Sequence, residues 1–400
     1  MEHQKRPSHF DIAVVGGGPA GRSAALVLAR QGFSVALLAP DSDPADGRTT
    51  ALWQKSIAVL KEIGVWDDLE LKAAPLQKMR MIDDTGRLVR APEVTFDSSE
   101  LGLNEFGFNI RNSDLNEALS AACGNADTLT HFNARLETAS FEQDHVSLNG
   151  DNGTEIRANL AVAADGRSSR LRDAAGIEVK RWSYPQVAVV LNLDHDRPHQ
   201  NMSVEFHTPS GPFTLVALPG RSSSLVCVVT AEEAERLCGL DTSVLEMELE
   251  RRAHSIFGKF RITTKPQSFP LSGLSAPKLV GKRLALVGET AHVFPPIGAQ
   301  GLNLSQRDVG DLADVLAKAA ASGKDFESDT ILAAYETKRS ADVRSRTFAV
   351  DALNRSLLTD FLPVQAARSA GMYLADKIGP FRRLLMREGI APGTGFQLRS

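Results

Sequence analysis

The chain has 400 residues, more than the roughly 250–300 that a single hydrophobic core normally holds, so we expect two lobes. Hydrophobic residues make up 42% of it and charged residues 24%, which excludes a disordered protein. The formal net charge of -4 argues against nucleic-acid binding driven by bulk charge.

No metal site, disulfide scaffold or membrane span is expected. The three cysteines, Cys123, Cys227 and Cys238, have no CxxC spacing, which favours idle thiols in a reducing compartment. No run of about 18 apolar residues occurs. The basic N-terminus is not followed by the apolar core of a signal peptide, so we expect a cytoplasmic protein.

The first forty residues predict a nucleotide-binding unit. A β-branched strand over 10–15 runs into a glycine-rich turn, then a helix over 23–30 and a second strand over 33–38. In this context G-x-G-x-x-G allows a tight turn, close approach of a pyrophosphate and close helix–strand packing. The free N–H groups of the helix N-terminus favour phosphate. The predicted cofactor-binding residues here are Gly16, Gly18, Pro19, Ala20 and Gly21.

The second strand lacks the acid that usually ends it and holds the ribose hydroxyls. Ala39 stands at that position, followed by Pro40 and Asp41. Two interpretations stay open. Either Asp41 reaches back to the ribose, or the ribose has no such clamp, which predicts weaker cofactor binding.

Strand-like segments at hairpin spacing occupy the middle of the chain. They predict a second, antiparallel sheet. Its strands are expected at 79–83, 187–193, 202–206, 213–218 and 224–229.

Two further strands end in loops of unusual composition. A strand over 160–164 is followed by Asp165, Gly166 and a basic turn. A strand over 283–287 leads into a loop over 288–303 that is rich in glycine and proline, and then into a helix to about residue 320.

In this order and spacing, the three motifs resemble those of the single-component FAD aromatic hydroxylases, the family of p-hydroxybenzoate hydroxylase. The resemblance covers nearly the whole chain. Residues 288–303 are similar to the second FAD fingerprint of the family and Asp165-Gly166 to its DG motif. The ubiquinone-biosynthesis hydroxylases are the branch it resembles most, through the segments 48–52, 209–219 and 353–355.

The resemblance implies roles around FAD for the second fingerprint. Glu289 stands where the family has an Asp that bonds the ribityl chain, and its carboxylate still accepts that bond. Prolines 295–296 would line the flavin loop with Gly298. Gly301, Leu302 and Asn303 would open a helix whose N–H groups face N1 and the C2 carbonyl and so favour reduced, anionic flavin. The remaining residues of the expected FAD site are Arg48, Arg111, Asn112, Asp165, Gly166, Gly288 and Pro295.

Three assignments leave alternatives. Arg48 is expected at the pyrophosphate or the flavin edge, or else is a solvated loop arginine. Asn112 either contacts the flavin or caps a helix over 114–122. His292 is expected as a satisfied side chain in a fixed loop rather than as a catalyst.

The activity implied by the resemblance is FAD-dependent hydroxylation of an aromatic ring. Flavin reduced by NAD(P)H or by a reductase partner reacts with O₂ to a C4a-hydroperoxide, which transfers one hydroxyl to the ring. The cofactor supplies this chemistry, so we name no catalytic side chain. No Arg/Tyr group for a substrate carboxylate stands out, which favours a prenylated phenol of ubiquinone biosynthesis over a small benzoate.

The C-terminal residues 361–400 predict an amphipathic surface element. They carry six basic and two acidic residues, a net charge of +4, interleaved with apolar side chains. Such a segment lies on a membrane, here its inner face, or docks on its own protein or a second subunit. Other quinone-biosynthesis enzymes are further expected partners.

Two other functions stay open: an FAD-dependent prenyl reductase of the same fold, and a non-catalytic FAD-binding subunit of a quinone-synthesis complex. A halogenase is disfavoured, because the three tryptophans are too scattered for W-x-W-x-x-P. The expected class is α/β, with a Rossmann-like parallel sheet, an interleaved antiparallel sheet and a helical tail. The FAD domain is expected at 1–75, 101–180 and 273–345, the substrate domain at 76–100 and 181–272, and the tail at 346–400.

Overall fold

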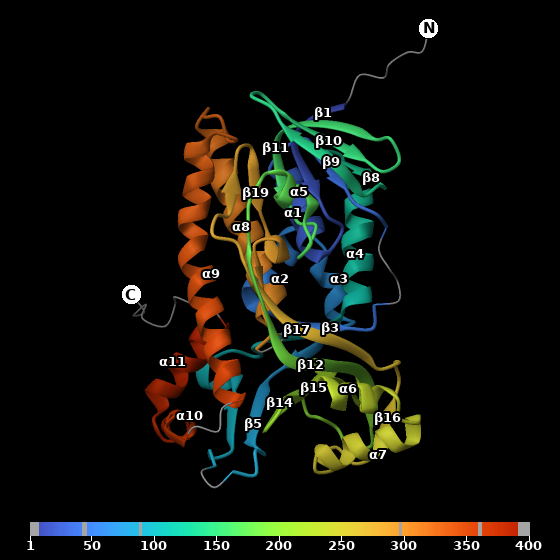
Figure 1. The fold of residues 1–400 in the computed structure, drawn as a ribbon, viewed down its shortest axis with the longest axis vertical. Helices are drawn as coiled ribbons and strands as arrows, with labels where there is room; N and C mark the ends of the chain where they lie inside the picture. The colour runs from blue at the N-terminus through green and yellow to red at the C-terminus, as the bar shows by residue number, and fades with distance from the viewer. Residues whose placement is uncertain (1–7, 42–45, 88–89, 296–297, 359–361, 391–400) are drawn as a thin grey trace.

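The structure is a computed structural model that describes residues 8–41, 46–87, 90–295, 298–358 and 362–390 (Figure 1). Two sheets define two lobes, which we call the first and the second lobe. The first lobe lies at the top of Figure 1 and the second below it.

The first lobe is built on a mainly parallel sheet of eight strands. Its parallel core has the order β19-β11-β1-β2-β8. The strands β1 and β2 end in fully buried aliphatic runs, as expected where both faces of a parallel sheet are covered. The strands are β1 (Ser8–Val15), β2 (Val35–Leu38), β8 (Leu129–Phe132), β9 (Leu136–Phe141), β10 (Val146–Gly150), β11 (Glu155–Ala163), β18 (Val280–Gly281) and β19 (Leu284–Leu286).

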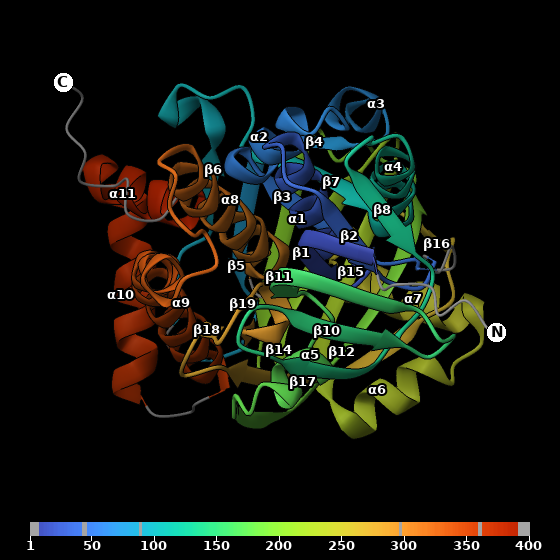
Figure 2. The same ribbon diagram turned by 90° about the horizontal axis from the view of Figure 1, so that it is seen from above.

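Helices cover this sheet. The helix α1 crosses from β1 to β2 and packs against α4 and α8. From above, α1 and α4 lie on one side of β1 and β2, and the hairpin β9–β10 lies on the other (Figure 2). The helices of this lobe are α1 (Pro19–Arg30), α2 (Gln54–Glu62), α3 (Trp66–Glu70), α4 (Asn112–Gly124), α5 (Arg170–Ala174), the 3-10 turn η2 (Gly288–Thr290), α8 (Gln300–Ala321) and α9 (Asp329–Leu358).

The second lobe is a sheet of nine strands in the order β20-β17-β12-β15-β14-β13-β5-β6, with β16 added to β12. The pairs are antiparallel except β5–β13, which is parallel because a long excursion separates these two strands. The strands are β5 (Lys78–Asp83), β6 (Val94–Asp97), β12 (Lys180–His195), β13 (Met202–Thr208), β14 (Gly211–Leu218), β15 (Ser222–Thr230), β16 (Phe260–Ile262), β17 (Gln267–Ser275) and β20 (His292–Val293).

The two faces of this second sheet have different neighbours. Alternate residues such as Val189 and Cys227 pack against the helices α6 (Ala231–Cys238) and α7 (Thr242–Arg252). The other face turns to the first lobe, where Thr49 Oγ1 bonds Ser224 Oγ at 2.8 Å. Between the lobes lies a small sheet of β3 (Thr49–Trp53), β7 (Gly107–Arg111) and β4 (Ala74–Leu76).

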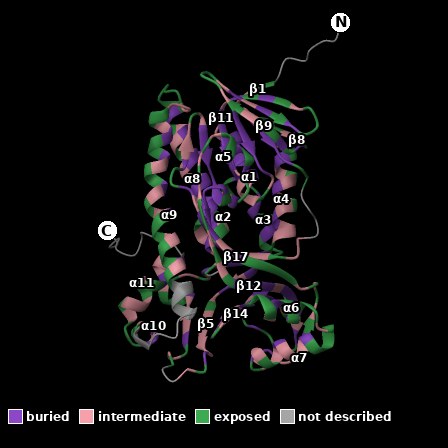
Figure 3. Ribbon diagram, viewed as in Figure 1, coloured by how far each residue is buried: buried purple, intermediate pink, exposed green. Residues whose placement is uncertain are grey.

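The C-terminal helices run along one edge of both lobes. The long α9 passes through residue 346, so the expected start of the tail falls inside a helix. It is followed by α10 (Leu362–Lys377) and α11 (Gly379–Ile390), whose surfaces are more exposed than the first-lobe core (Figure 3). The Arg382 guanidinium bonds Glu100 at 2.6 Å, near the 3-10 turn η1 (Ser98–Leu101), and so anchors α11 to the second lobe. No helix within the described ranges is both long and apolar enough to cross a membrane.

Candidate cofactor and substrate site

The first glycine turn is fixed by the backbone packed beneath it. Gly16 has a φ of +124°, and a Cβ there would lie 2.1 Å from the Ala164 carbonyl oxygen. A Cβ on Gly21 would lie 2.0 Å from the Gly16 carbonyl oxygen. At Gly18, by contrast, a Cβ would meet nothing within 4 Å. The turn is therefore closed on the protein side and open at Gly18, where α1 begins with Pro19, as a pyrophosphate requires.

The residue directly after β2 is not an acid. Ala39 is fully buried, and Asp41 accepts a hydrogen bond from Asn133 Nδ2 at 2.6 Å. Asp41 is thus bonded to the residue that follows β8, and whether it also reaches a ribose stays a prediction. Sequence reasoning missed Arg22, which is 1% exposed and donates to the Gly17 carbonyl. Burial lowers the pKa of Arg22. The sequence signal that could have identified this residue is an arginine directly after the last fingerprint glycine.

The DG motif supports the first turn from below. The Asp165 carboxylate accepts bonds from Ser169 Oγ at 2.5 Å and from the Leu171 N–H at 3.2 Å, so it holds the start of α5. Burial raises the pKa of Asp165. Gly166 adopts a φ of +82°, which places the turn after β11 directly beneath Gly16.

The second fingerprint begins beside the first. A Cβ on Gly288 would lie 2.9 Å from Ser305 Oγ and 3.5 Å from the Cβ of Ala20. Gln306 on α8 donates to Ser23 Oγ on α1 at 3.0 Å. Two loops that are far apart in the sequence therefore meet at the N-terminal ends of α1 and α8.

A buried ion network anchors the second loop from behind. Asp308 is 1% exposed and accepts bonds from the Gly288 N–H at 3.0 Å, His292 Nε2 at 2.6 Å and Arg339 Nε at 2.7 Å. Burial alone would raise the pKa of Asp308, but His292 and Arg339 outweigh it and hold that pKa low. His292 thus lies in a fixed buried loop, stacked on Phe294 at 5.4 Å, but it is only half satisfied, because its Nδ1 is buried with no partner among the described residues.

The polar residues expected near FAD converge at the start of β3. The Arg48 guanidinium bonds Asp46 at 2.8 Å, and Asn112 Nδ2 bonds the same carboxylate at 3.2 Å. The hydrogen bond that Arg48 donates to Asp46 raises the pKa of Arg48, and Glu289 adds to this through its charge. Glu289 also pairs with Arg167 at 3.5 Å.

The helix-cap alternative for Asn112 is wrong. The helix α4 begins at Asn112 itself, and the exposed Arg111 is its N-cap residue. Asn112 lies inside the first turn, where its side chain is free to reach Asp46.

The loop before α8 contains two residues in the left-handed region and leads to an unobstructed glycine. Gly298 and Ala299 have φ values of +67° and +52°, and a Cβ on Gly301 would meet nothing within 4 Å. Pro295 is buried and Leu302 packs on the first-lobe core, whereas Pro296 lies outside the described residues.

The Asn303 side chain is fully used within the protein. Its Oδ1 accepts from the Trp53 N–H at 2.8 Å and Ser56 Oγ at 2.7 Å. Its Nδ2 donates to the carbonyls of Ala51 at 2.7 Å and Ala299 at 2.6 Å. Asn303 therefore positions β3 against the second loop, and its side chain has no donor or acceptor left for a cofactor.

An apolar cluster lies where the two lobes and α11 meet, and Ala299 of the second loop packs against it. Sequence reasoning missed it, because its members come from segments hundreds of residues apart. We call this set the junction cluster: Ala51, Trp53, Ala74, Leu76, Phe106, Ala217 and Met386.

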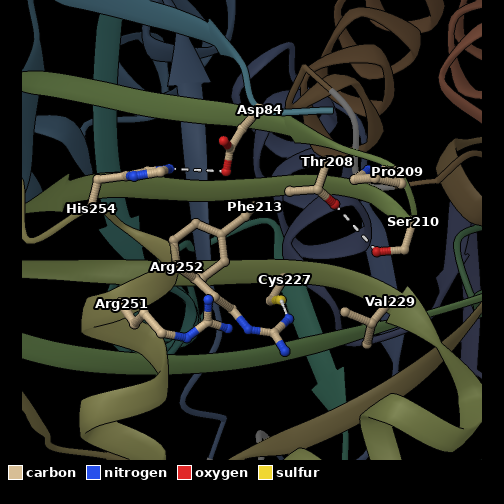
Figure 4. A pocket seen from close by; sticks show the side chains of 10 residues that line it. All are labelled: Asp84, Thr208, Pro209, Ser210, Phe213, Cys227, Val229, Arg251, Arg252 and His254. Carbon is tan, nitrogen blue, oxygen red and sulfur yellow. Dashed lines mark hydrogen bonds and ion pairs between the residues drawn. The ribbon is translucent and has the colours of Figure 1, made fainter. Parts of the chain in front are cut away.

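A cavity of about 280 Å³ lies on the α7 side of the second sheet, and Figure 4 shows the side chains that line it. Its floor includes Phe213 and Cys227, and its charged groups are paired with one another or with nearby acids. His254 bonds Asp84 at 3.0 Å, and Arg252 bonds Glu248 at 2.9 Å. This cavity is separate from the site formed by the two loops.

The described residues contain no cluster of three or more His, Cys, Asp or Glu side chains suited to a metal ion. Burial raises the pKa of Cys123 and of Cys227 to about 11, so neither thiol is ionised near neutral pH. Cys238 is exposed.

Comparison with known proteins gives matches along nearly the whole chain. The sequence model of the FAD binding domain family matches residues 9–347. Ubiquinone hydroxylase UbiL of Rhodospirillum rubrum is 33% identical over 387 residues, which cover 95% of this chain and 89% of that protein. The 3-demethoxyubiquinol 3-hydroxylase of Escherichia coli is 30% identical over 387 residues, which cover 94% and 97%.

The fold is similar to that of p-nitrophenol 4-monooxygenase PnpA from Pseudomonas putida. The two structures superpose with a TM-score of 0.78 at 19% identity, over 95% of this chain and 98% of that one. At this identity the likeness concerns the fold alone.

Proposed function

Since the chain belongs to the FAD binding domain family and is an FAD-dependent monooxygenase, we propose that it hydroxylates the aromatic ring of a polyprenyl phenol in ubiquinone biosynthesis. The full-length similarity to two ubiquinone hydroxylases, at 33% and 30% identity, carries this proposal. The apolar junction cluster beside the second loop supports it, because a prenyl chain needs apolar surroundings.

The residues present fit FAD. The space beside Gly18 and Gly301 is open, and any side chain at these positions would fill it. Both glycines stand at helix N-termini, which favour negative charge. We propose that Gly16 to Gly21 hold the pyrophosphate and that Gly298 to Asn303 lie along the flavin ring. Arg48, Arg111, Asn112, Asp165, Gly166, Gly288, Glu289 and Pro295 complete the proposed site.

When bound, FAD reduced by NAD(P)H or a reductase supplies the activation of O₂ that places one oxygen atom on the ring. The chain contributes position and environment. The N-terminus of α8 stabilises negative charge next to it, and the apolar side chains of the junction cluster exclude water. The ion network around Asp308 keeps the loop that carries Glu289 in place. We propose that the first lobe is the FAD domain and the second the substrate domain, with the boundaries expected from the sequence except at residue 346, which lies inside α9.

The test is turnover of the FAD-loaded protein with NAD(P)H or a reductase, ¹⁸O₂ and a panel of prenylated phenols. Mass spectrometry should find one labelled oxygen atom on the ring. Saturation of a prenyl double bond without oxygen incorporation would establish the prenyl reductase instead. Flavin that no donor reduces would favour the non-catalytic subunit.

We propose that the C-terminal helices rest on an anionic membrane surface. Tyr373 and Leu374 on α10, Leu385 on α11 and Ile378 between the two helices are between 41% and 55% exposed, and both helices also carry exposed basic side chains. Arg399, the last basic residue of the tail, lies outside the described residues. Contact with other quinone-biosynthesis enzymes stays a prediction.

Co-sedimentation with anionic liposomes tests the membrane proposal. The full chain should bind more strongly than a Leu374→Ser/Ile378→Ser variant or a tail-deleted protein, and neutral liposomes should bind all three weakly. Equal binding of all three proteins to anionic liposomes would contradict it.

A further inference from the structure

The backbone of Trp53 is tied directly to the loop before α8. Trp53 is the last residue of β3, and its N–H donates to Asn303 Oδ1 at 2.8 Å. The same amide group donates from Nδ2 to the Ala299 carbonyl at 2.6 Å. One side chain thus links Trp53 to the loop proposed to lie along the flavin ring.

The indole of Trp53 lies inside the junction cluster. Its ring covers Gly107, where a Cβ would lie 3.0 Å from Cε3 of the indole. The residue is 6% exposed, and its Nε1 is buried with no hydrogen-bond partner among the described residues. The other members of the cluster are Ala, Leu, Phe and Met side chains, which cannot accept the indole proton well.

An indole N–H can only donate, and a buried donor without a partner costs free energy. When such a buried donor lies next to a ligand site, we expect it to donate its hydrogen bond to the ligand. The partner must bring an acceptor atom into otherwise apolar surroundings. A phenol on a prenyl chain has this composition: one ring oxygen and a large apolar remainder.

We propose that Trp53 Nε1 donates a hydrogen bond to the phenolic oxygen of the substrate and so sets which ring carbon faces the flavin. This assignment rests on the proposed function. Trp53 is here the residue that fixes ring orientation, and Asn303 is the positioning residue that holds Trp53 against the second loop. The bond is stronger to an ionised phenol, because a charged acceptor strengthens a hydrogen bond.

The chain offers a matched control in Trp66. This residue is 1% exposed, and its Nε1 also has no partner in the described part of the chain. It lies in the first-lobe core, edge-on to Phe108 at 5.1 Å, and not in the junction cluster. The third tryptophan, Trp182, donates from Nε1 to the Tyr184 hydroxyl at 2.7 Å.

The experiment measures binding of a short-chain prenylphenol and of the matching prenylbenzene to the FAD-loaded protein, from the change in flavin absorbance. Trp53→Phe should weaken prenylphenol binding about tenfold, as expected for one lost hydrogen bond, and leave prenylbenzene binding within about twofold. Trp66→Phe should change neither. Equal losses for both ligands, or unchanged prenylphenol binding, would overturn the assignment.

Two further outcomes are distinguishable. An altered flavin spectrum of Trp53→Phe without ligand would mean that the indole bonds the cofactor, which overturns the assignment but not the proposed function. Failure of wild-type protein to bind either ligand would overturn the proposed function and this inference with it.

A second measurement avoids substitution. The wild-type chain has three tryptophans, so its ¹H–¹⁵N spectrum should contain three indole signals. Prenylphenol should shift one of them strongly, and prenylbenzene should not. An identical response to both ligands would count against a bond to the phenolic oxygen.

Discussion

The paired loops and the junction cluster lie side by side but are built in different ways. The loops are fixed by backbone: a Cβ at Gly16 or Gly21 would overlap a carbonyl oxygen at about 2 Å. The junction cluster is held by side chains from β3, β4, β14 and α11 that touch only in the folded protein. A single added carbon should therefore damage the loops, whereas the cluster should respond gradually to changes of size.

The largest effects are expected where glycine is required. Gly18→Val should leave the protein folded but lower FAD affinity by about a hundredfold or more, because the added side chain fills the open space at the start of α1. Flavin content after reconstitution measures the effect, and Gly310→Ala, in open space on α8, is the control. Normal flavin content in Gly18→Val would contradict the expectation that the loops, unlike the junction cluster, cannot accept an added side chain.

The same region should separate folding from binding. Gly21→Val places side-chain atoms against the Gly16 carbonyl, so the protein without FAD should itself be destabilised or fail to fold. Circular dichroism of both variants without flavin distinguishes the two cases. Equal thermal stability of the two would mean that the collision at Gly21 is relieved by backbone movement.

The next largest effect is expected in the ion network behind the second loop. Asp308→Asn removes the carboxylate shared by Arg339, His292 and the Gly288 N–H, while Arg339 keeps Asp311 and Asp342, and should cost about 3 kcal/mol of unfolding free energy. Denaturant unfolding measures the loss. Lys338→Met, which removes an exposed pair with Asp311, should cost less than about 1 kcal/mol. Similar losses in both variants would contradict this account.

The junction cluster should give a smaller, local effect. Met386→Ala removes a side chain that is 6% exposed and should weaken the docking of α11 by about 2 kcal/mol. Amide hydrogen exchange should become faster in α11 and stay unchanged in β1 and β2. Leu385→Ala, on a side chain that is 41% exposed, is the control and should change exchange little.

The smallest effect concerns pH and the outer face of the second lobe. The hydrogen bond from Arg236 lowers the pKa of Glu233 to about 2, from an ordinary 4.5. A lowered carboxyl pKa stabilises the fold above pH 4.5, and this contribution is lost as the pH falls from 4.5 towards 2. Glu233→Gln should therefore reduce the drop in melting temperature between pH 7 and pH 3, by at most about 3 °C. Identical drops in melting temperature for both proteins would show that the Arg236–Glu233 pair does not contribute to stability.

The sequence predicts the loops well because their chemistry is local. Gly16, Gly18 and Gly21 stand within one turn, and the strand before them and the helix after them are visible from periodicity alone. The second fingerprint is likewise continuous from Gly288 to Asn303. A site formed by backbone atoms needs the same spacing of glycines in every sequence that forms it.

The junction cluster and the ion network could not be predicted in the same way. Trp53 and Met386 are more than three hundred positions apart, and Arg339 reaches Asp308 from another helix. Asn303 shows the limit most clearly, because its position was predicted but its four side-chain bonds were not. Such contacts depend on how the elements pack, which periodicity does not encode.

The order of strands in the first sheet also constrains biosynthesis. Strand β1 pairs with β11, so the neighbour of Ser8 is Ile156, and β11 in turn pairs with β19 at Leu284. A chain emerging from the ribosome at about 5–20 residues per second cannot complete this sheet until β19, which ends at Leu286, has been synthesised. Translation products truncated before Asn303 should therefore leave the ribosome colourless, because the yellow cofactor can enter only after both glycine loops have been synthesised.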